Sequence, residues 1–185
     1  MNGGTGFVLW LTGLSAAGKS TIAGLVARDL ERRGLLTDRL DGDVVRTHLT
    51  KGLGFSKEDR DTNIERIGWV ASRLARAGAA VIVSVISPYE EGRQKARALT
   101  EEHAPFVEVH VATSLAECER RDPKGLYAMA HAGEISDFTG VDDPYEEPSS
   151  PELRIDTEGR TPEASAQLVI GLLVELGLIR SEVAA

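Results

Sequence analysis

The sequence predicts a three-layer α/β sandwich, with helices covering both faces of a parallel five-stranded sheet. Short apolar runs without polar alternation recur along the chain, and such runs are typical of parallel strands buried on both faces. Segments with the apolar spacing of helices separate these runs, and this alternation indicates right-handed βαβ units. The 185 residues show no internal repeat and no linker, so we expect residues 1–185 to form a single domain.

Three of the expected strands lie in the first half of the chain. Residues 7–12 and 79–86 are almost wholly apolar, whereas residues 35–40 include two charged side chains. Helices are expected over residues 19–33 and 63–77, because apolar residues recur there three and four positions apart. A glycine follows each of these helices, and glycine commonly ends a helix.

The second half of the chain supplies the other two strands, over residues 106–111 and 153–155. A charged surface helix is expected over residues 91–102, after Pro88, and another helix is expected to start at Ser114 and to run to residue 121. The last helix is expected over residues 161–177, because it opens with Thr-Pro-Glu, which places a capping hydroxyl before a proline in the first turn.

Residues 122–151 have a different composition from the segments around them. Prolines stand at positions 123, 144, 148 and 151, and several glycines lie between them. Such a stretch is expected to be mostly loop, and its length suits a lid over a binding site.

The charge balance excludes some classes of partner. The chain has 21 Lys and Arg against 29 Asp and Glu, a formal net charge of −8, which argues against nucleic-acid binding. The longest apolar run, residues 77–86, is too short to cross a membrane. We therefore expect a small-molecule partner, no membrane contact and a cytoplasmic location.

A glycine-containing segment between the first strand and the first helix fits the Walker A pattern of P-loop proteins. The glycines allow backbone N–H groups to surround a phosphate, and the helix N-terminus adds a favourable dipole. We expect ATP and Mg²⁺ here, with Lys19 at the β- and γ-phosphates and the Ser20 hydroxyl on the metal. The expected nucleotide-binding residues are Gly13, Leu14, Ser15, Ala16, Ala17, Gly18, Lys19, Ser20 and Thr21.

The Walker A pattern alone leaves several activities open. ATPases, GTPases, small-molecule kinases and nucleotide-dependent regulators all contain it. The chain has no Asn-Lys-x-Asp sequence, the pattern with which GTPases recognise guanine, and its small size and lid-like segment favour a kinase.

Two carboxylates flank a glycine directly after the second strand, in the sequence Asp41-Gly42-Asp43. Ligands of open α/β sheets bind at the carboxyl ends of strands. Two carboxylates beside a phosphate site suit the binding of magnesium-bound water or the acceptance of a proton. An Asp-Gly turn is the alternative, but it does not explain the second carboxylate near Arg46.

A longer set of ordered motifs extends from this point toward Thr157. They include Leu53-Gly54-Phe55-Ser56, Ile86-Ser87-Pro88-Tyr89, Lys124-Gly125-Leu126-Tyr127, Phe138-Thr139-Gly140-Val141-Asp142 and Pro144-Tyr145-Glu146. With these motifs the sequence resembles the adenylyl-sulfate kinases, from Trp10 onward. The resemblance implies a nucleotide-kinase-like P-loop fold, a homodimer, and ATP-dependent phosphorylation of the 3′-hydroxyl of adenosine 5′-phosphosulfate for sulfate assimilation.

The resemblance also implies roles for individual residues. Phe55 and Phe138 are expected to sandwich the acceptor adenine, and Arg121 is expected near the donor. The implied acceptor site consists of Asp41, Asp43, Arg46, Phe55, Arg60, Asn63, Ile86, Ser87, Lys124 and Phe138.

The predicted catalytic residues are Lys19, Asp43 and Ser87. Lys19 would neutralise developing charge, and Asp43 would act as the base or, with Ser20, as an anchor for the metal. A serine matching Ser87 has been assigned in this family as a phosphoserine intermediate. We interpret Ser87 first as a pocket residue, because no neighbouring base in the sequence would activate it and phosphoryl transfer requires no covalent step.

Two other functions stay open at this point. One is a small-molecule kinase with a different hydroxyl acceptor, and the other is a regulatory nucleotide-binding protein without catalysis. The chain departs from the family it resembles at Glu65 and Glu90, where members often have arginine, and at Val85, where phenylalanine is common. We expect these departures to weaken acceptor binding modestly.

Overall fold

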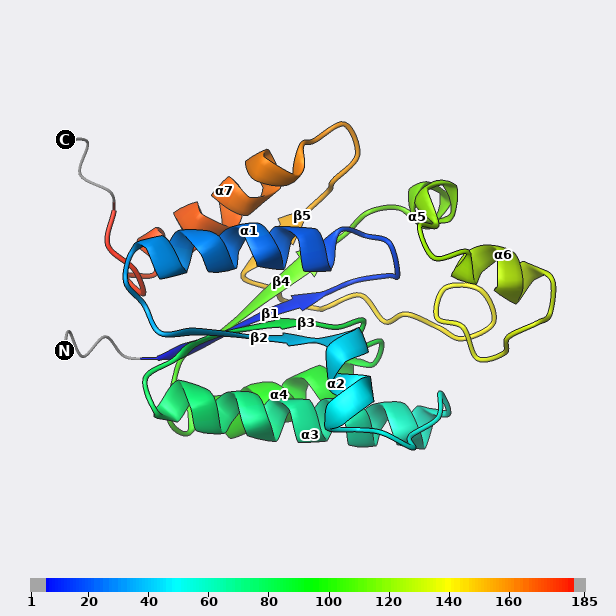
Figure 1. Ribbon diagram of the computed structural model, residues 1–185, viewed down its shortest axis with the longest axis horizontal. Helices are drawn as coiled ribbons and strands as arrows, with labels where there is room; N and C mark the ends of the chain where they lie inside the picture. The colour runs from blue at the N-terminus through cyan, green and yellow to red at the C-terminus, as the bar shows by residue number, and fades with distance from the viewer. Residues whose placement is uncertain (1–5, 182–185) are drawn as a thin grey trace.

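The computed structural model describes residues 6–181, and within them five strands form one wholly parallel sheet (Figure 1). The strand order is β2-β3-β1-β4-β5, so the first strand lies at the centre. This confirms the predicted fold class. The strands are β1 (Phe7–Thr12), β2 (Thr37–Asp41), β3 (Ala80–Ser84), β4 (Phe106–Val111) and β5 (Leu153–Ile155).

Four long helices form the two outer layers. In Figure 1, α1 (Lys19–Arg32) and α7 (Pro162–Glu175) lie above the sheet, and α3 (Lys57–Arg76) and α4 (Glu90–Glu101) lie below it. Two hydrophobic clusters fill the spaces between the layers, and every side chain of β1 is buried. Burial on both faces explains why β1 shows no polar alternation.

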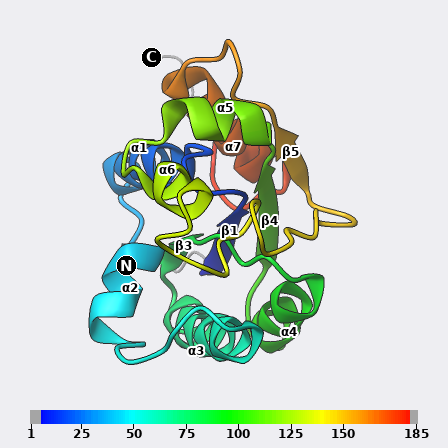
Figure 2. The same cartoon turned by 90° about the vertical axis from the view of Figure 1, so that its right-hand side faces the viewer.

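Three short helices lie beyond the carboxyl ends of the strands. They are α2 (Gly42–His48), α5 (Leu115–Arg121) and α6 (Leu126–His131). Figure 2 views the molecule from this end, with α5 and α6 in front of the sheet. The sheet therefore presents the ends of its strands to a space bordered by short helices and loops.

Two helix starts differ from the sequence-based expectation. The helix expected over residues 63–77 begins at Lys57, because the Ser56 hydroxyl accepts a hydrogen bond from the backbone N–H of Asp59. After β2 the chain forms α2, and Asp41 caps it by accepting from the backbone N–H of Asp43 at 3.2 Å. The alternative interpretation of Asp41-Gly42 as a simple turn is therefore wrong.

Two strands and the lid-like segment also differ in detail. β2 begins two residues later than expected, and β3 ends at Ser84, where its pairing with both β1 and β2 stops. Residues 122–151 are mostly loop, as expected, but they include α6. This helix has six residues and no side-chain cap, so the sequence held no clear signal for it.

Among the described residues, no helix combines the length and the apolar character that a membrane span requires.

Candidate active site

A cavity of about 560 Å³ opens at the carboxyl ends of the strands, where ligands bind in open α/β sheets. Its wall comes from four parts of the chain that are far apart in the sequence. These are the glycine-containing loop with the start of α1, the segment from α2 to α3, the connection from β3 to α4, and the segment 122–139. The expected lid therefore borders the cavity.

The loop of residues 13–18 has a backbone that depends on glycine. Gly13 has φ 146°, and a Cβ there would lie 2.4 Å from the carbonyl oxygen of Val111. Gly18, at φ 105°, directly precedes α1. Ala16 also has positive φ, 60°, a conformation that costs an alanine about 1–2 kcal/mol. The loop thus holds a shape that an ordinary sequence would not adopt.

Lys19 lies buried at the first turn of α1 and reaches back into this loop. Its Nζ donates to the carbonyl oxygens of Gly13 and Leu14, at 2.9 and 2.6 Å. Burial lowers the pKa of Lys19 to about 8. An ammonium has three donors, so one N–H stays available for a phosphate oxygen.

Hydroxyl groups and an arginine support the loop from behind. The carbonyl oxygen of Ala17 accepts from the hydroxyls of Thr113 and Thr157, at 2.9 and 3.3 Å. Arg121 donates to the Thr157 hydroxyl at 2.9 Å, and its side chain lies near Gly18. Four expected nucleotide-site residues are absent from the cavity wall and contact it only through neighbours, namely Gly13, Leu14, Ala17 and Arg121.

Asp41 connects the loop to the acceptor side of the cavity. Its Oδ2 accepts from the hydroxyls of Ser20, at 2.6 Å, and Ser84, at 2.8 Å. Burial by itself would raise the pKa of Asp41, but these hydrogen bonds and that from the N–H of Asp43 hold it below its usual value. A hydroxyl and a carboxylate this close are oxygen donors of the kind that Mg²⁺ takes.

Asp43 is in a different environment. Its carboxylate is largely exposed and accepts a hydrogen bond from the Lys124 ammonium. Lys124 comes from the lid-like segment, so this contact joins two expected site residues that are 81 positions apart in the chain.

Two arginines lie beside an exposed phenylalanine. The Phe55 side chain is 55% exposed, and the guanidinium carbons of Arg46 and Arg60 lie 4.4 and 5.5 Å from its ring centre. Burial and the neighbouring charge of Arg60 lower the pKa of Arg46. Arg60 also donates to the carbonyl oxygens of Phe55 and Asp137. Two cations beside a flat apolar ring suit a ligand that is anionic and aromatic.

The remaining acceptor residues form the inner wall. The side-chain amide oxygen Oδ1 of Asn63 accepts from the Thr50 hydroxyl at 2.7 Å. Phe138 packs edge-on against Tyr127, with ring centres 4.9 Å apart. Ser87 is buried, and its hydroxyl accepts from Trp10 Nε1 at 3.1 Å and donates to the Thr12 hydroxyl at 2.9 Å. All ten expected acceptor residues, with Ile86 and Phe55 among them, line this same cavity.

Sequence reasoning missed several buried hydroxyl groups at the carboxyl edge of the sheet. They belong to Thr12, Ser84, Thr113 and Thr157, which end a strand or follow one. The available signal was a hydroxyl residue at or just after the end of a buried apolar run. A buried hydroxyl needs a hydrogen-bond partner, so its presence there indicates a polar site at the edge of the sheet.

The expected effect of the family departures is only partly supported by their positions. Val85 lines the cavity, but neither Glu65 nor Glu90 does. Glu90 instead accepts from Arg93, Gln94 and Ser149. Its carboxylate is thus engaged by residues of α4 and by Ser149, away from the cavity wall, and the expected weakening of acceptor binding stays a prediction.

Comparison with known families gives one match over most of the chain. The model of the family described as Adenylylsulphate kinase matches residues 5–156. The adenylyl-sulfate kinase of Picosynechococcus sp. is 53% identical over 174 residues, which are 94% of this chain and 97% of that protein.

Solved structures with a similar fold include two described as APS kinases. The APS kinase CysC of Mycobacterium tuberculosis, in complex with AMPPNP and APS, has a TM-score of 0.88 and 48% identity over 91% of this chain and 98% of that one. The hexameric APS kinase of Thiobacillus denitrificans has a TM-score of 0.76 and 36% identity, over 97% of this chain and 31% of that chain.

Proposed function

The chain belongs to the adenylylsulphate kinase family, and from that premise we propose how its residues divide the reaction between them. The reaction transfers the γ-phosphate of ATP to the 3′-hydroxyl of adenosine 5′-phosphosulfate (APS), giving ADP and 3′-phosphoadenylyl sulfate. The observation that carries the proposal is the single cavity that joins a Walker A loop to two arginines beside an exposed phenylalanine.

The donor half holds the triphosphate through residues 13–21. Backbone N–H groups of the loop surround the phosphates, and the Lys19 ammonium adds positive charge that neutralises the transferring group. The contact between Ser20 and Asp41 supports a magnesium site at this point, with Asp43 reaching it through water. The metal, when bound, would neutralise charge on the phosphates. Arg121 supports the loop from behind through Thr157.

The acceptor half binds APS by charge and by stacking. Arg46 and Arg60 attract the phosphosulfate, because a cation pair is the strongest available partner for that group. Phe55 and Phe138 stack against the adenine, and Asn63 and the wall of residues 86–87 complete the pocket.

Asp43 is proposed as the residue that accepts the proton of the attacking hydroxyl. Its carboxylate lies at the boundary between the two halves, and its only hydrogen-bonded side chain partner among the described residues is Lys124. That lysine comes from residues 122–151, so closing of this segment over the ligands would bring a second positive charge beside the transferring phosphate. Transfer then runs directly from ATP to APS, without a phosphoserine at position 87.

The decisive test is a coupled assay of ADP release with ATP and APS, with the product identified by mass spectrometry. We expect ADP and 3′-phosphoadenylyl sulfate in equal amounts, and a requirement for Mg²⁺ that is lost with a chelator. Rapid phosphorylation of another hydroxyl compound with no activity on APS would favour the alternative kinase. No turnover with any acceptor, despite ATP binding, would favour the regulatory protein.

Three further expectations stay predictions with their own tests. Assembly as a homodimer is supported in general terms by the hexameric relative, and light scattering of the purified protein tests it. A cytoplasmic location is tested by cell fractionation. A role in sulfate assimilation predicts that loss of the gene makes growth depend on a reduced sulfur source.

A further inference from the structure

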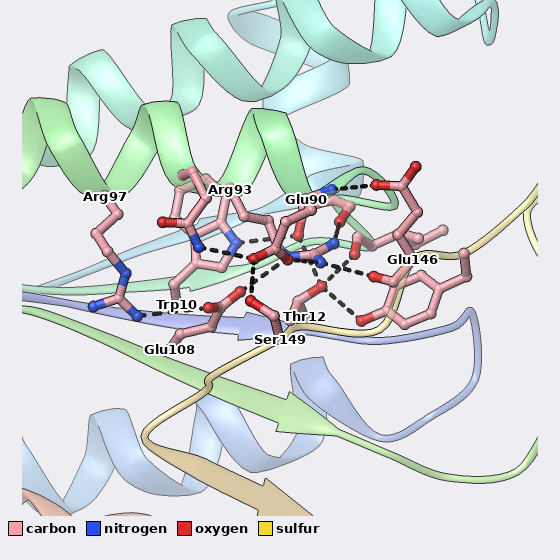
Figure 3. A network of polar contacts seen from close by, with 12 residues as sticks. Trp10, Thr12, Glu90, Arg93, Arg97, Glu108, Glu146 and Ser149 are labelled. Atoms are coloured by element: carbon pink, nitrogen blue, oxygen red, sulfur yellow. Dashed lines mark hydrogen bonds and ion pairs between the residues drawn. The ribbon is translucent and has the colours of Figure 1, made fainter.

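Arg93 is a fully buried arginine on α4 that does not line the active-site cavity. Burying a guanidinium is costly unless every N–H has a partner, so its contacts indicate why it is there. Figure 3 shows it at the centre of a polar network between α4, the sheet and the returning limb of residues 143–149.

Four polar contacts define the position of Arg93. One terminal nitrogen donates to the backbone carbonyl oxygen of Ser87 at 2.7 Å. The other donates to the backbone carbonyl oxygen of Glu146 at 2.7 Å and to the Glu90 carboxylate. Nε lies 3.0 Å from Oε1 of Glu108, an ion pair without hydrogen-bond geometry, and Glu108 is buried as well.

The carbonyl that Arg93 holds belongs to a residue in an unusual conformation. Ser87 has φ 43°, in the left-handed region that residues other than glycine rarely adopt. Such a conformation persists only where the surroundings fix it. Hydrogen bonds with Trp10 and Thr12 fix the Ser87 hydroxyl, and a hydrogen bond from Arg93 fixes its carbonyl oxygen.

The second carbonyl lies on the limb that returns from the lid. The backbone N–H of Glu146 donates to the carbonyl oxygen of Pro88 at 2.8 Å. The Glu146 carboxylate accepts from the backbone N–H of Glu90. The Tyr145 hydroxyl contacts the Thr12 hydroxyl at 3.0 Å. Arg93 therefore connects the segment around Ser87 with the segment around Glu146, behind the acceptor wall.

We propose that Arg93 is a positioning residue for the acceptor: it fixes the turn at Ile86–Ser87–Pro88 and the lid limb at Glu146 in one arrangement from behind the cavity. This inference rests on the acceptor pocket proposed above. It assigns to a residue that touches no substrate a specific effect on APS binding, with little effect on the nucleotide loop across the cavity.

The chain offers a matched control one helical turn away. Arg97 pairs with the same Glu108, at 3.5 Å, and with Glu101 and Glu152. It stacks over Phe106 and has no hydrogen bond to the turn of residues 86–88 or to Glu146 in the described structure. The two arginines share their carboxylate partner but differ in whether they reach the acceptor wall.

The experiment compares Arg93→Lys with Arg97→Lys. Each keeps a positive charge near Glu108, but one ammonium cannot reproduce the two-pronged contact of Arg93 with Ser87 and Glu146. We expect Arg93→Lys to raise the KM for APS at least about tenfold, because small displacements of a binding wall have large effects. The KM for ATP should change less than about twofold, because the hydrogen bonds of Arg93 go to Ser87, Glu90 and Glu146 and not to the loop of residues 13–18. Arg97→Lys should leave both constants unchanged.

A second variant keeps the test decisive if Arg93→Lys does not fold. Arg93→Met combined with Glu108→Gln replaces the buried ion pair by neutral groups and leaves no buried charge unpaired. It should show the same selective rise in the KM for APS. A folded Arg93 variant with an unchanged KM for APS, or with equal rises for both substrates, would overturn the inference.

These outcomes are separable from failure of the proposed function. If the unaltered protein shows no APS-dependent ADP release, the proposed function itself fails. If the unaltered protein is active and Phe55→Ala raises the KM for APS but Arg93→Lys does not, only the role of Arg93 is wrong.

Discussion

The donor and acceptor halves of the cavity differ in how their side chains are held. On the donor half, nine consecutive residues form the loop and the first turn of α1, and Lys19 is buried with hydrogen bonds to the loop's own carbonyls. On the acceptor half, the residues come from distant segments and Phe55 is exposed; Asp43, at the boundary between the two halves, is exposed as well.

The donor half is held in shape by contacts within the protein, whereas the acceptor half has exposed surface that a ligand would cover. The donor loop has its shape fixed by Gly13, Ala17 and the hydroxyls behind it. The acceptor half leaves the apolar Phe55 ring open to solvent beside Arg46 and the buried Arg60, and exposed apolar surface has a free-energy cost unless a ligand covers it. Substitutions in the donor half should therefore remove activity, and those in the acceptor half should mainly change the KM for APS.

The largest expected effect is that of Lys19→Ala. Removing the ammonium takes away charge stabilisation of the transferring phosphate and leaves the Gly13 and Leu14 carbonyls without their donor. We expect kcat to fall by at least about 10²–10³-fold. ADP release with both substrates measures it, and circular dichroism checks the fold. Near-normal turnover in a folded variant would show that the donor half does not depend on its buried lysine.

Asp43→Asn tests the boundary between the halves. The amide keeps the size of the side chain but cannot accept a proton, so kcat should fall by about 10²–10⁴-fold. The KM for ATP should change little, because Asp43 has no hydrogen bond to the loop of residues 13–18 in the described structure. A rise confined to the KM for ATP would assign Asp43 to nucleotide binding.

Phe55→Ala tests the acceptor half alone. Loss of a stacking ring costs about 1–3 kcal/mol per base, so the KM for APS should rise about 5–150-fold. Since the side chain is 55% exposed, thermal stability should hardly change. The matched control is Trp69→Ala, which removes an exposed aromatic, 53% accessible, that does not line the cavity. Equal effects of the two variants would remove the stacking role.

The same contrast explains how much the sequence predicted. The fold followed from β1, β3 and β4, which are largely apolar in sequence and buried at every position because both faces of the sheet are covered. The donor loop followed from a contiguous pattern whose geometry needs Gly13 and Gly18. These features are local in sequence, so local reasoning reached them.

The acceptor half could not be assembled from local patterns. That Lys124 meets Asp43 and that Arg60 meets the backbone of Asp137 depend on chain folding over 81 and 77 positions. Resemblance to the family assigned Asp43, Arg60 and Lys124 to one site, but it did not indicate the contact with Asp137. Neither the local sequence patterns nor the family resemblance identified Arg93. An arginine in a charged helix is usually solvated, and nothing in the sequence distinguishes Arg93 from Arg97.

A smaller effect is expected from pH, and it should appear only in the donor half. Burial lowers the pKa of Lys19 from 10.5 to about 8. Phosphate binding favours the ammonium, so the KM for ATP should be constant below this pKa and rise above it. The rise approaches about tenfold per pH unit, since each unit removes that factor of protonated lysine. The KM for APS should lack this inflection, because arginines supply its charge and stay protonated. An inflection near pH 8 shared by both constants would contradict the separation.

The smallest expected effect on activity is that of Ser87→Ala, which tests whether a residue of the acceptor wall takes part in chemistry. The Ser87 hydroxyl is buried and already occupied, since it accepts from Trp10 and donates to Thr12. Neither partner is a base, so nothing near the hydroxyl would activate it for attack on ATP. Direct transfer predicts that kcat stays within a few-fold of the unaltered value, and that labelled ATP without APS leaves no phosphate on the protein.

Stability should respond to Ser87→Ala more than turnover does. Removing the hydroxyl leaves the indole N–H of Trp10, which is fully buried, without an acceptor, and an unsatisfied buried donor costs about 1–3 kcal/mol. Urea unfolding of Ser87→Ala should show a loss of this size, and Trp10→Phe should make a further Ser87→Ala less costly, because the unsatisfied donor is then gone. Stoichiometric labelling of Ser87 at the rate of turnover would reverse the argument: the acceptor wall would then take part in the chemistry, and the division between a catalytic donor half and a binding acceptor half would fail at this residue.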